Sequence, residues 1–182
     1  MVATNSIPVA DSSVCSDLDD SSVEAVSKSF AMSLRYRAWR LVVEGKYSEA
    51  ESCLRRAVAI CESLYGPEDP KVVASLMVLA DLYLRWGKSQ QTPMGTFGSR
   101  SKQAEPLYLR VIHIALGTDS LDHYVTGITL NNLAVLYEDQ GRFPLARSFF
   151  RSALAVMEFN LGLDHPMTLG IRHSLEKLNA VN

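Results

Sequence analysis

The chain has 182 residues, of which 47% are hydrophobic and 21% are charged, and its net charge is −2. This length suits one domain or one short repeat array, and the apolar content is enough to build a core. The nearly balanced charge gives no reason to expect binding to nucleic acid or to an anionic membrane. No uncharged apolar run reaches the roughly 18 residues that a membrane-spanning helix needs, so membrane insertion is not expected.

The first segment, residues 1–24, is predicted to be a disordered tail rich in serine and acidic residues. Serines alternate with aspartates there, and so few apolar side chains cannot offset the entropy lost on folding. The segment has neither the basic start and apolar core of a secretory signal nor the arginines of a transit peptide. The three cysteines, Cys15, Cys53 and Cys61, form no disulfide framework, which favours reduced thiols and a cytoplasmic protein.

Residues 29–180 are predicted to be one helical repeat domain, because a motif returns along them. The stretch GKYSEAE at 45–51 recurs as GRFPLAR at 141–147, and an interrupted copy lies between the two. The matched alanines of the three copies define a period of 42 residues with one insertion of 12. They are Ala50, Ala104 and Ala146. A fixed period of this length is typical of stacked helix pairs, none of which can bury its apolar face alone.

In chain order, the period predicts three helix pairs and a final capping helix. The repeats are expected at 29–65, 70–117 and 124–161, with helices at 29–44 and 47–65, 70–86 and 102–117, 124–140 and 143–161, and the cap at 167–180. Residues 89–101 contain the insertion and have the composition of a flexible loop.

Two local signals support these helices. A glycine is expected to end the first helix of each pair, and the three are Gly45, Gly87 and Gly141. One stripe of each second helix alternates small and large side chains at offsets of 4, 7 and 11, which places it towards the core. The stripes are Ala50, Leu54, Ala57 and Cys61, then Ala104, Tyr108, Val111 and Ala115, then Ala146, Phe150, Ala153 and Met157.

The stretch TLNNLAVLYEDQGRF at 129–143, RSALAV at 151–156 and the connection LGLDHP at 161–166 resemble the tetratricopeptide repeat, in the 42-residue variety of kinesin light chains. The resemblance implies an all-α fold, a right-handed α–α superhelix of three helical pairs and a C-terminal capping helix. It also implies a non-catalytic scaffold that binds a peptide segment of a protein partner in a concave groove lined by the first helices.

Two other functions remain open. One is a kinesin-light-chain-like motor cargo adaptor, and the other is a regulatory subunit or domain of an enzyme complex. The resemblance does not extend to the long heptad segment by which light chains bind the motor heavy chain, because the N-terminal residues here are acidic and not heptadic. The adaptor function is therefore the alternative rather than the leading hypothesis.

Alignment with the family points to groove-facing positions on the three first helices. They are Met32, Tyr36 and Trp39, then Ala74, Val78, Asp81 and Arg85, then Ile128, Asn132, Val135 and Asp139. Asn132 matches the asparagine by which such repeats hold a peptide backbone, since an amide both donates and accepts; the alternative is an asparagine bonded only to its neighbours. Val78 and Asp81 stand where a carboxylate clamp needs basic or polar groups, so a groove of mixed character is expected.

No catalytic residue, metal site or cofactor is expected. The four histidines are dispersed, and the chain has neither a glycine-rich phosphate loop nor a paired metal-binding cysteine motif. The expected partner is a protein or peptide. Weak self-association through the first repeat is a further hypothesis, because Phe30, Met32 and Leu34 are expected to be incompletely covered at that end.

Overall fold

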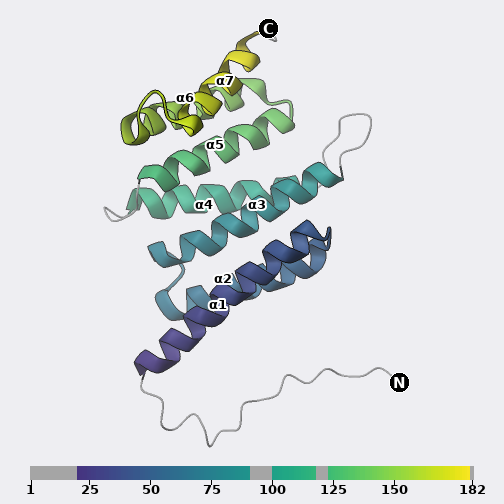
Figure 1. The fold of residues 1–182 in the computed structure, drawn as a ribbon, viewed down its shortest axis with the longest axis vertical. Coiled ribbons are helices and arrows are strands. Elements are labelled where there is room, and N and C mark those ends of the chain that lie inside the picture. The colour runs from purple at the N-terminus through teal and green to yellow at the C-terminus, as the bar shows by residue number, and fades with distance from the viewer. Residues whose placement is uncertain (1–19, 91–99, 118–122, 181–182) are drawn as a thin grey trace, which may run out of the picture.

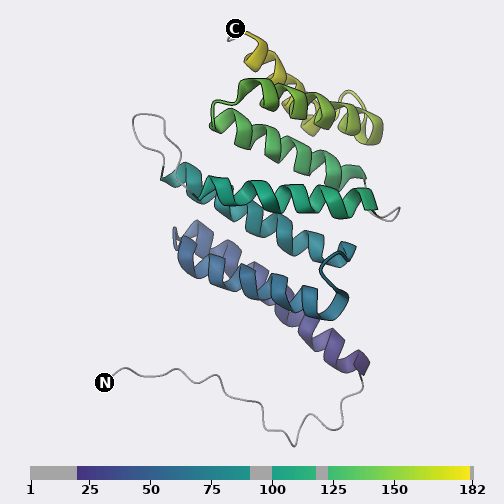
Figure 2. The same cartoon turned by 180° about the vertical axis from the view of Figure 1, so that it is seen from behind.

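The computed structural model describes residues 20–90, 100–117 and 123–180, which form seven α-helices and two short 3₁₀ helices. The helices are α1 (Asp20–Val43), α2 (Tyr47–Tyr65), η1 (Pro70–Val72), α3 (Val73–Ser89), η2 (Ser101–Gln103), α4 (Ala104–Gly117), α5 (His123–Asp139), α6 (Phe143–Leu161) and α7 (Pro166–Ala180). They stack as three pairs and a last helix, with α1, α3 and α5 on one face (Figure 1) and α2, α4 and α6 on the other (Figure 2). The predicted all-α superhelix is confirmed.

The first helix is longer than predicted. It begins at Asp20 rather than at residue 29, so the prediction of a tail is wrong for residues 20–24. The added turns reach the end of α2, where burial and then a hydrogen bond to Glu24 raise the pKa of Tyr65. Composition averaged over the whole segment could not reveal this contact. The rest of the predicted tail, residues 1–19, and most of the predicted insertion, residues 91–99, lie outside the described residues.

Two of the three glycines that were expected to end a helix do so. Gly45 and Gly141 follow α1 and α5 with φ of 75° and 72°, a left-handed conformation that L side chains rarely adopt. Gly87 instead lies inside α3, so that prediction is wrong. A Cβ at position 87 would lie 2.6 Å from the Cβ of Ser101, because η2 meets α3 at this point. Glycine is therefore required at position 87 for a close approach of two segments rather than for a turn.

The predicted stripes of the second helices form the core. Every stripe residue is buried in α2, α4 and α6. The small residues allow neighbouring helices to approach, and large ones such as Tyr108 and Phe150, which are fully buried, fill the space between them. Leu34 belongs to the same core and is only 4% exposed, so the expectation that it would be incompletely covered is wrong. Phe30 and Met32 are 46% and 54% exposed, as expected.

Two hydrogen bonds with the same spacing join successive repeats. Tyr83 of α3 donates to Glu51 Oε1 of α2 at 2.7 Å, and Tyr137 of α5 donates to Glu105 Oε1 of α4 at 2.8 Å. The partners are 32 residues apart in both cases, so the second helix of one repeat holds the first helix of the next. We call these the inter-repeat Glu–Tyr pairs. Burial and then the glutamate raise the pKa of Tyr83 and of Tyr137 to about 12, which keeps both hydroxyls protonated as donors at neutral pH.

Candidate functional site

The predicted groove residues belong to α1, α3 and α5, the helices of one face of the solenoid (Figure 1), but they differ in exposure. On α1, the side chains of Met32, Tyr36 and Trp39 are 54%, 66% and 61% exposed. On α3 and α5, Ala74 and Arg85 are exposed and the other predicted positions are partly buried. The partly buried positions are Val78, Asp81, Ile128, Asn132, Val135 and Asp139. The face therefore has an open part on α1 and a more enclosed part between α3 and α5.

The enclosed part contains a pocket of about 310 Å³. It is lined by Asp81, Leu84, Arg85, Lys88 and Asn132. Asn132 Nδ2 of α5 donates to Asp81 Oδ1 of α3 at 3.0 Å. Three of the predicted residues are thus brought together, while Leu84 and Lys88 were not predicted. Lys88 could have been found from its spacing, because residues three apart on a helix are neighbours on its surface and Arg85 was already on the predicted face.

Asp81 is the most constrained polar group of this pocket. Tyr108 of α4 donates to the same Oδ1 at 2.5 Å. Burial raises the pKa of Asp81 and outweighs the hydrogen bonds from Tyr108 and Asn132 and the charge of Arg85, which lower it. The fold thus keeps a carboxylate where its charge is disfavoured. Such a group in a pocket is a candidate for function rather than for stability.

Asn132 already has partners on both ends of its amide. Its Nδ2 donates to Asp81, and its Oδ1 accepts from Asn131 Nδ2 at 3.5 Å. The second bond is long and therefore weak, so a ligand N–H could replace it at small cost. This arrangement fits the alternative of an asparagine bonded to its neighbours.

An ion pair closes one side of the pocket. Lys88 Nζ of α3 lies 2.9 Å from Asp139 Oδ2 of α5, and the two side chains are 43% and 17% exposed. Burial raises the pKa of Asp139, although the hydrogen bond and charge of Lys88 lower it. Within the described ranges Arg85 makes no ion pair. Arg85 is therefore the cation of this pocket that is left to meet a ligand.

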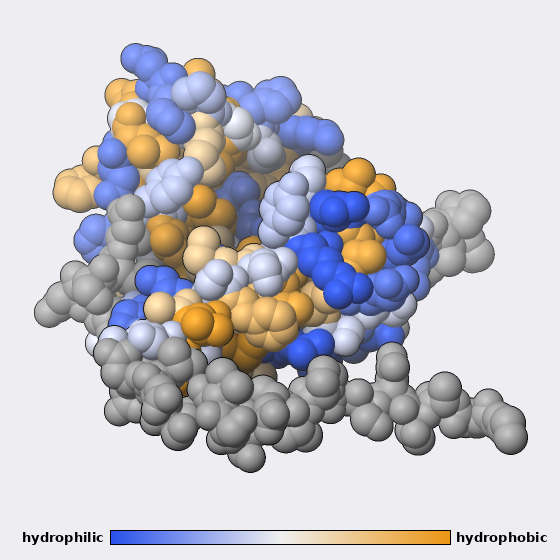
Figure 3. Space-filling model, turned by 60° about the horizontal axis from the view of Figure 1, so that its bottom comes forward, coloured by the Kyte–Doolittle hydropathy of each residue, from blue (hydrophilic) through white to orange (hydrophobic). Residues whose placement is uncertain are grey.

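The open part of the face is an apolar stripe on α1. Met32, Tyr36, Trp39 and Val43 follow one another at helical spacing, and Val43 is 71% exposed. The rings of Tyr36 and Trp39 stack with their centroids 6.2 Å apart. Figure 3 brings this end of the molecule forward and shows apolar surface exposed on it. We call these four residues the aromatic stripe. Val43 was not predicted, although it precedes the predicted Arg85 by one 42-residue period and so occupies the equivalent position of the first repeat.

Three predicted positions serve the core instead of the pocket. Val78, Ile128 and Val135 are partly buried and pack against the hydrophobic core, and none of them lines the pocket between α3 and α5. The alignment placed them on the concave face. It could not show how far the neighbouring first helix would cover them.

The described residues offer little for other kinds of site. In ranges 20–90, 100–117 and 123–180, no three His, Cys, Asp or Glu side chains are grouped to hold a metal ion. Over the same part of the chain, every helix is too short or too polar to cross a membrane.

Comparisons with known proteins agree with this architecture. The sequence matches the family model of the tetratricopeptide repeat at residues 41–91 and 99–176. A search of curated proteins finds no match. Among solved structures, the fold is similar to TPR-like repeats of a protein from Podosopora anserina described as a kinesin light chain, with a TM-score of 0.66 and 24% identity over 83% of this chain and 66% of that one. A single-substitution variant of the same repeats matches equally well. This chain thus spans slightly less than two thirds of these structures, and the likeness at this identity concerns the fold.

Proposed function

The chain belongs to the tetratricopeptide repeat family, and from that premise we propose that it is a non-catalytic scaffold that holds a segment of a protein partner against α1, α3 and α5. Members of such repeat families generally mediate protein–protein interaction through extended concave surfaces. The proposal specifies where on this chain the segment binds and which side chains hold it.

One observation carries the proposal. The pocket of Asp81, Arg85 and Asn132 is lined by α3 and α5, and the aromatic stripe is exposed on α1. These three first helices lie together on one face of the solenoid (Figure 1). An exposed pair of stacked rings is a suitable anchor for an apolar side chain, and such anchors supply most of the affinity of an interface. A polar pocket between the next two first helices can fix the direction and register of the bound backbone.

The pocket offers both kinds of partner that a peptide backbone needs. Asn132 Oδ1 can accept from a peptide N–H in place of its long contact to Asn131. Asp81 uses Oδ1 for both of its hydrogen bonds, so a second ligand N–H would be received by Oδ2. Arg85 can donate to a peptide carbonyl or carboxylate. The rigid hydrogen bonds around Asp81 keep these groups in place before the ligand arrives.

The test is a selection of random peptides displayed against the purified full chain, followed by calorimetric measurement of the dissociation constant for one selected peptide. Asn132→Ala and Arg85→Glu are each expected to weaken binding about tenfold or more, because each variant removes one or two hydrogen bonds to the peptide in a desolvated site. Arg151→Glu is the matched control, because Arg151 is exposed on α6, on the other face. Unchanged affinity in both groove variants, or equal weakening by the control, would contradict the proposal.

A further inference from the structure

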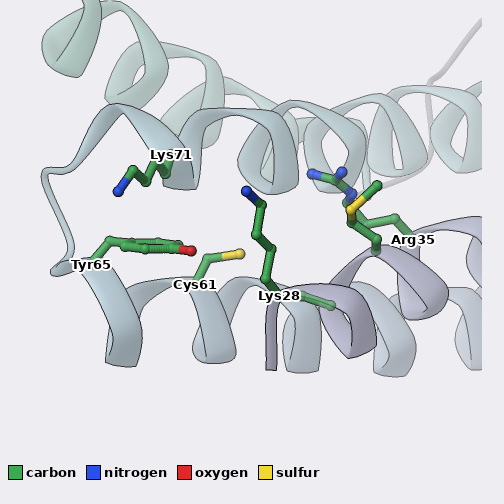
Figure 4. Close-up of a pocket in the computed structure, with 7 residues that line it drawn as sticks. Lys28, Arg35, Cys61, Tyr65 and Lys71 are labelled. Atoms are coloured by element: carbon green, nitrogen blue, oxygen red, sulfur yellow. The ribbon is translucent and has the colours of Figure 1, made fainter. Parts of the chain in front are cut away.

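A second pocket opens beside the aromatic stripe, and no part of the proposed function uses it. It has a volume of about 250 Å³ and lies between the middle of α1, the end of α2 and η1. Its charged lining residues are Lys28 and Arg35 of α1 and Lys71 of η1. In Figure 4, Lys28 and Arg35 lie side by side, whereas Lys71 comes from the opposite side of the pocket with its ammonium group beside the ring of Tyr65.

The three cations are available to an anion. In the part of the chain that the structure describes, none of them forms an ion pair, and Lys28 and Lys71 are exposed. Two carboxylates lie near the pocket but have other partners. Asp69 Oδ1 accepts from the backbone N–H of Lys71 at 2.8 Å, and Glu24 lies near enough to Tyr65 to raise the pKa of its hydroxyl. The lining itself contains no acidic residue.

The floor of this pocket is apolar. Ala31 and Cys61 are 3% and 7% exposed there, and the ring of Tyr65 lies 4.2 Å from Lys71 Nζ. The volume is several times the roughly 30 Å³ that one water takes in the liquid, so a side chain and its end group both fit. Cations at the rim and carbon at the floor suit a ligand side chain with an anionic end.

The charge and geometry favour a phosphoryl group over a single carboxylate. A carboxylate has one charge and two oxygens, whereas a phosphorylated serine has a charge of about −1.5 to −2 at pH 7 and three acceptor oxygens. Three cationic side chains that line one pocket match the charge and the acceptor oxygens of the larger anion better than those of a single carboxylate. Met32 lines this pocket and also begins the aromatic stripe, so a segment bound on the stripe can deliver its next side chains here.

We propose that this pocket binds a phosphorylated serine or threonine side chain of the partner segment, with Lys28, Arg35 and Lys71 as its ligands. The inference rests on the proposed function, because the segment that carries the phosphate is the one held on α1, α3 and α5. It goes beyond that function by naming the partner's chemistry, a phosphopeptide, and a modification that would switch its binding.

The experiment uses the purified full chain and two libraries of nonapeptides, degenerate except for a central phosphoserine or a central serine. We expect about tenfold greater recovery of the phosphoserine library, as charge-assisted hydrogen bonds to a dianion imply. Lys71→Ala and Arg35→Ala should each abolish most of this preference. Glu24→Gln should increase it, because the variant removes one of the two carboxylates near the pocket. Lys177→Ala is the matched control, because Lys177 is exposed on α7, and it should leave the preference for phosphoserine unchanged.

The outcomes separate this inference from the proposed function. Equal recovery of both libraries, reduced by Asn132→Ala but not by Lys71→Ala, would overturn the phosphate site and leave the groove intact. Failure of both libraries to bind would overturn the groove and the phosphate site together. A phosphoserine preference that survives Lys71→Ala and Arg35→Ala would also overturn the assignment. Circular dichroism of each variant ensures that a lost signal reflects the site and not the fold.

Discussion

At the scale of single residues, Asp81 shows most clearly a conflict between stability and site chemistry. Burial raises its pKa, and three polar neighbours only partly offset that effect. A carboxyl group whose pKa is higher in the folded than in the unfolded chain favours folding when protonated and disfavours it when ionised. The stability that protonated Asp81 contributes is therefore lost as the pH rises from its ordinary pKa of 3.8 through the higher folded-state value.

Asp81→Asn should for that reason be at least as stable as the wild type at pH 7, since the amide oxygen can still accept from Tyr108 and Asn132. The difference should vanish below the ordinary pKa of aspartate, where both side chains are neutral. Denaturant unfolding at pH 7 and at low pH measures it, with exposed Asp164→Asn as the control, expected within about 0.5 kcal/mol of the wild type. A clear loss of stability at pH 7 would mean that attraction to Arg85 outweighs burial.

Gly87 supplies a second prediction for a single residue. A methyl group at this position would overlap Ser101, both at its Cβ and at its backbone nitrogen 2.9 Å away. Gly87→Ala should therefore destabilise the fold by about 1–3 kcal/mol, as overpacking in a close contact does. The control is Gly170→Ala in α7, where nothing lies within 4 Å and the better helix propensity should stabilise by up to about 1 kcal/mol. Thermal unfolding compares the two, and equal effects would contradict the close contact.

At the scale of helices, the inter-repeat Glu–Tyr pairs set how one repeat joins the next. Burial raises the pKa of Glu51, but hydrogen bonds from Tyr83 and Arg55 and nearby positive charges outweigh it, so the pKa is lowered overall. A carboxylate of this kind stabilises the fold above its unfolded-state pKa. Its contribution is lost as the pH falls through the folded-state value. The first interface between repeats should therefore weaken in acid.

Tyr83→Phe should lower the free energy of unfolding by about 1 kcal/mol at neutral pH, the usual net worth of one such hydrogen bond. Glu51→Gln should also destabilise at pH 7, and its effect should shrink at a pH below the folded-state pKa of Glu51. Urea unfolding at both pH values tests this, with Tyr137→Phe as the equivalent change at the next interface. A Glu51→Gln effect that does not depend on pH would show that the charge is not what stabilises this contact.

The sequence predicted these helices well because the repeat imposes the same packing on each copy. Stripe residues such as Ala146 and Phe150 are buried as their period required. The period could not predict the start of α1 at Asp20, which depends on a contact with Tyr65 across the pair. It also assigned Gly87 the function of Gly45, whereas α3 continues past this residue to Ser89. Of the residues that line the pocket between α3 and α5, the family alignment named Asp81, Arg85 and Asn132 and did not name Lys88, whose partner lies on another helix.

At the scale of the whole molecule, α1 is the least covered element. Half of the exposed large apolar side chains in the described ranges lie on it, and they are Val23, Val26, Phe30, Met32, Tyr36, Trp39 and Val43. An end helix of a solenoid has a neighbour on one side only, so its other side stays open. The hypothesis of weak self-association through the first repeat therefore remains a prediction, and Val26 and Phe30, which are 63% and 46% exposed, are two accessible residues through which it can be tested.

Light scattering over a range of protein concentrations should show a mass that rises with concentration, and Val26→Glu should remove that rise. Phe159→Glu is the control, because Phe159 is 85% exposed on α6, away from this end. A mass equal to the monomer at every concentration would refute self-association. A rise removed by the control alone would place the contact elsewhere.

The contact between Gly87 and Ser101 has a consequence for how such an array can change. The end of α3 and the start of η2 lie next to each other. The number of residues that connect them therefore does not change how the second repeat is positioned relative to the first and the third. The 42-residue period can therefore resume after an insertion of 12 as if nothing had intervened. This junction is therefore a site in the solenoid where a reporter or an added domain could be inserted. The helices before and after it would keep their positions relative to one another.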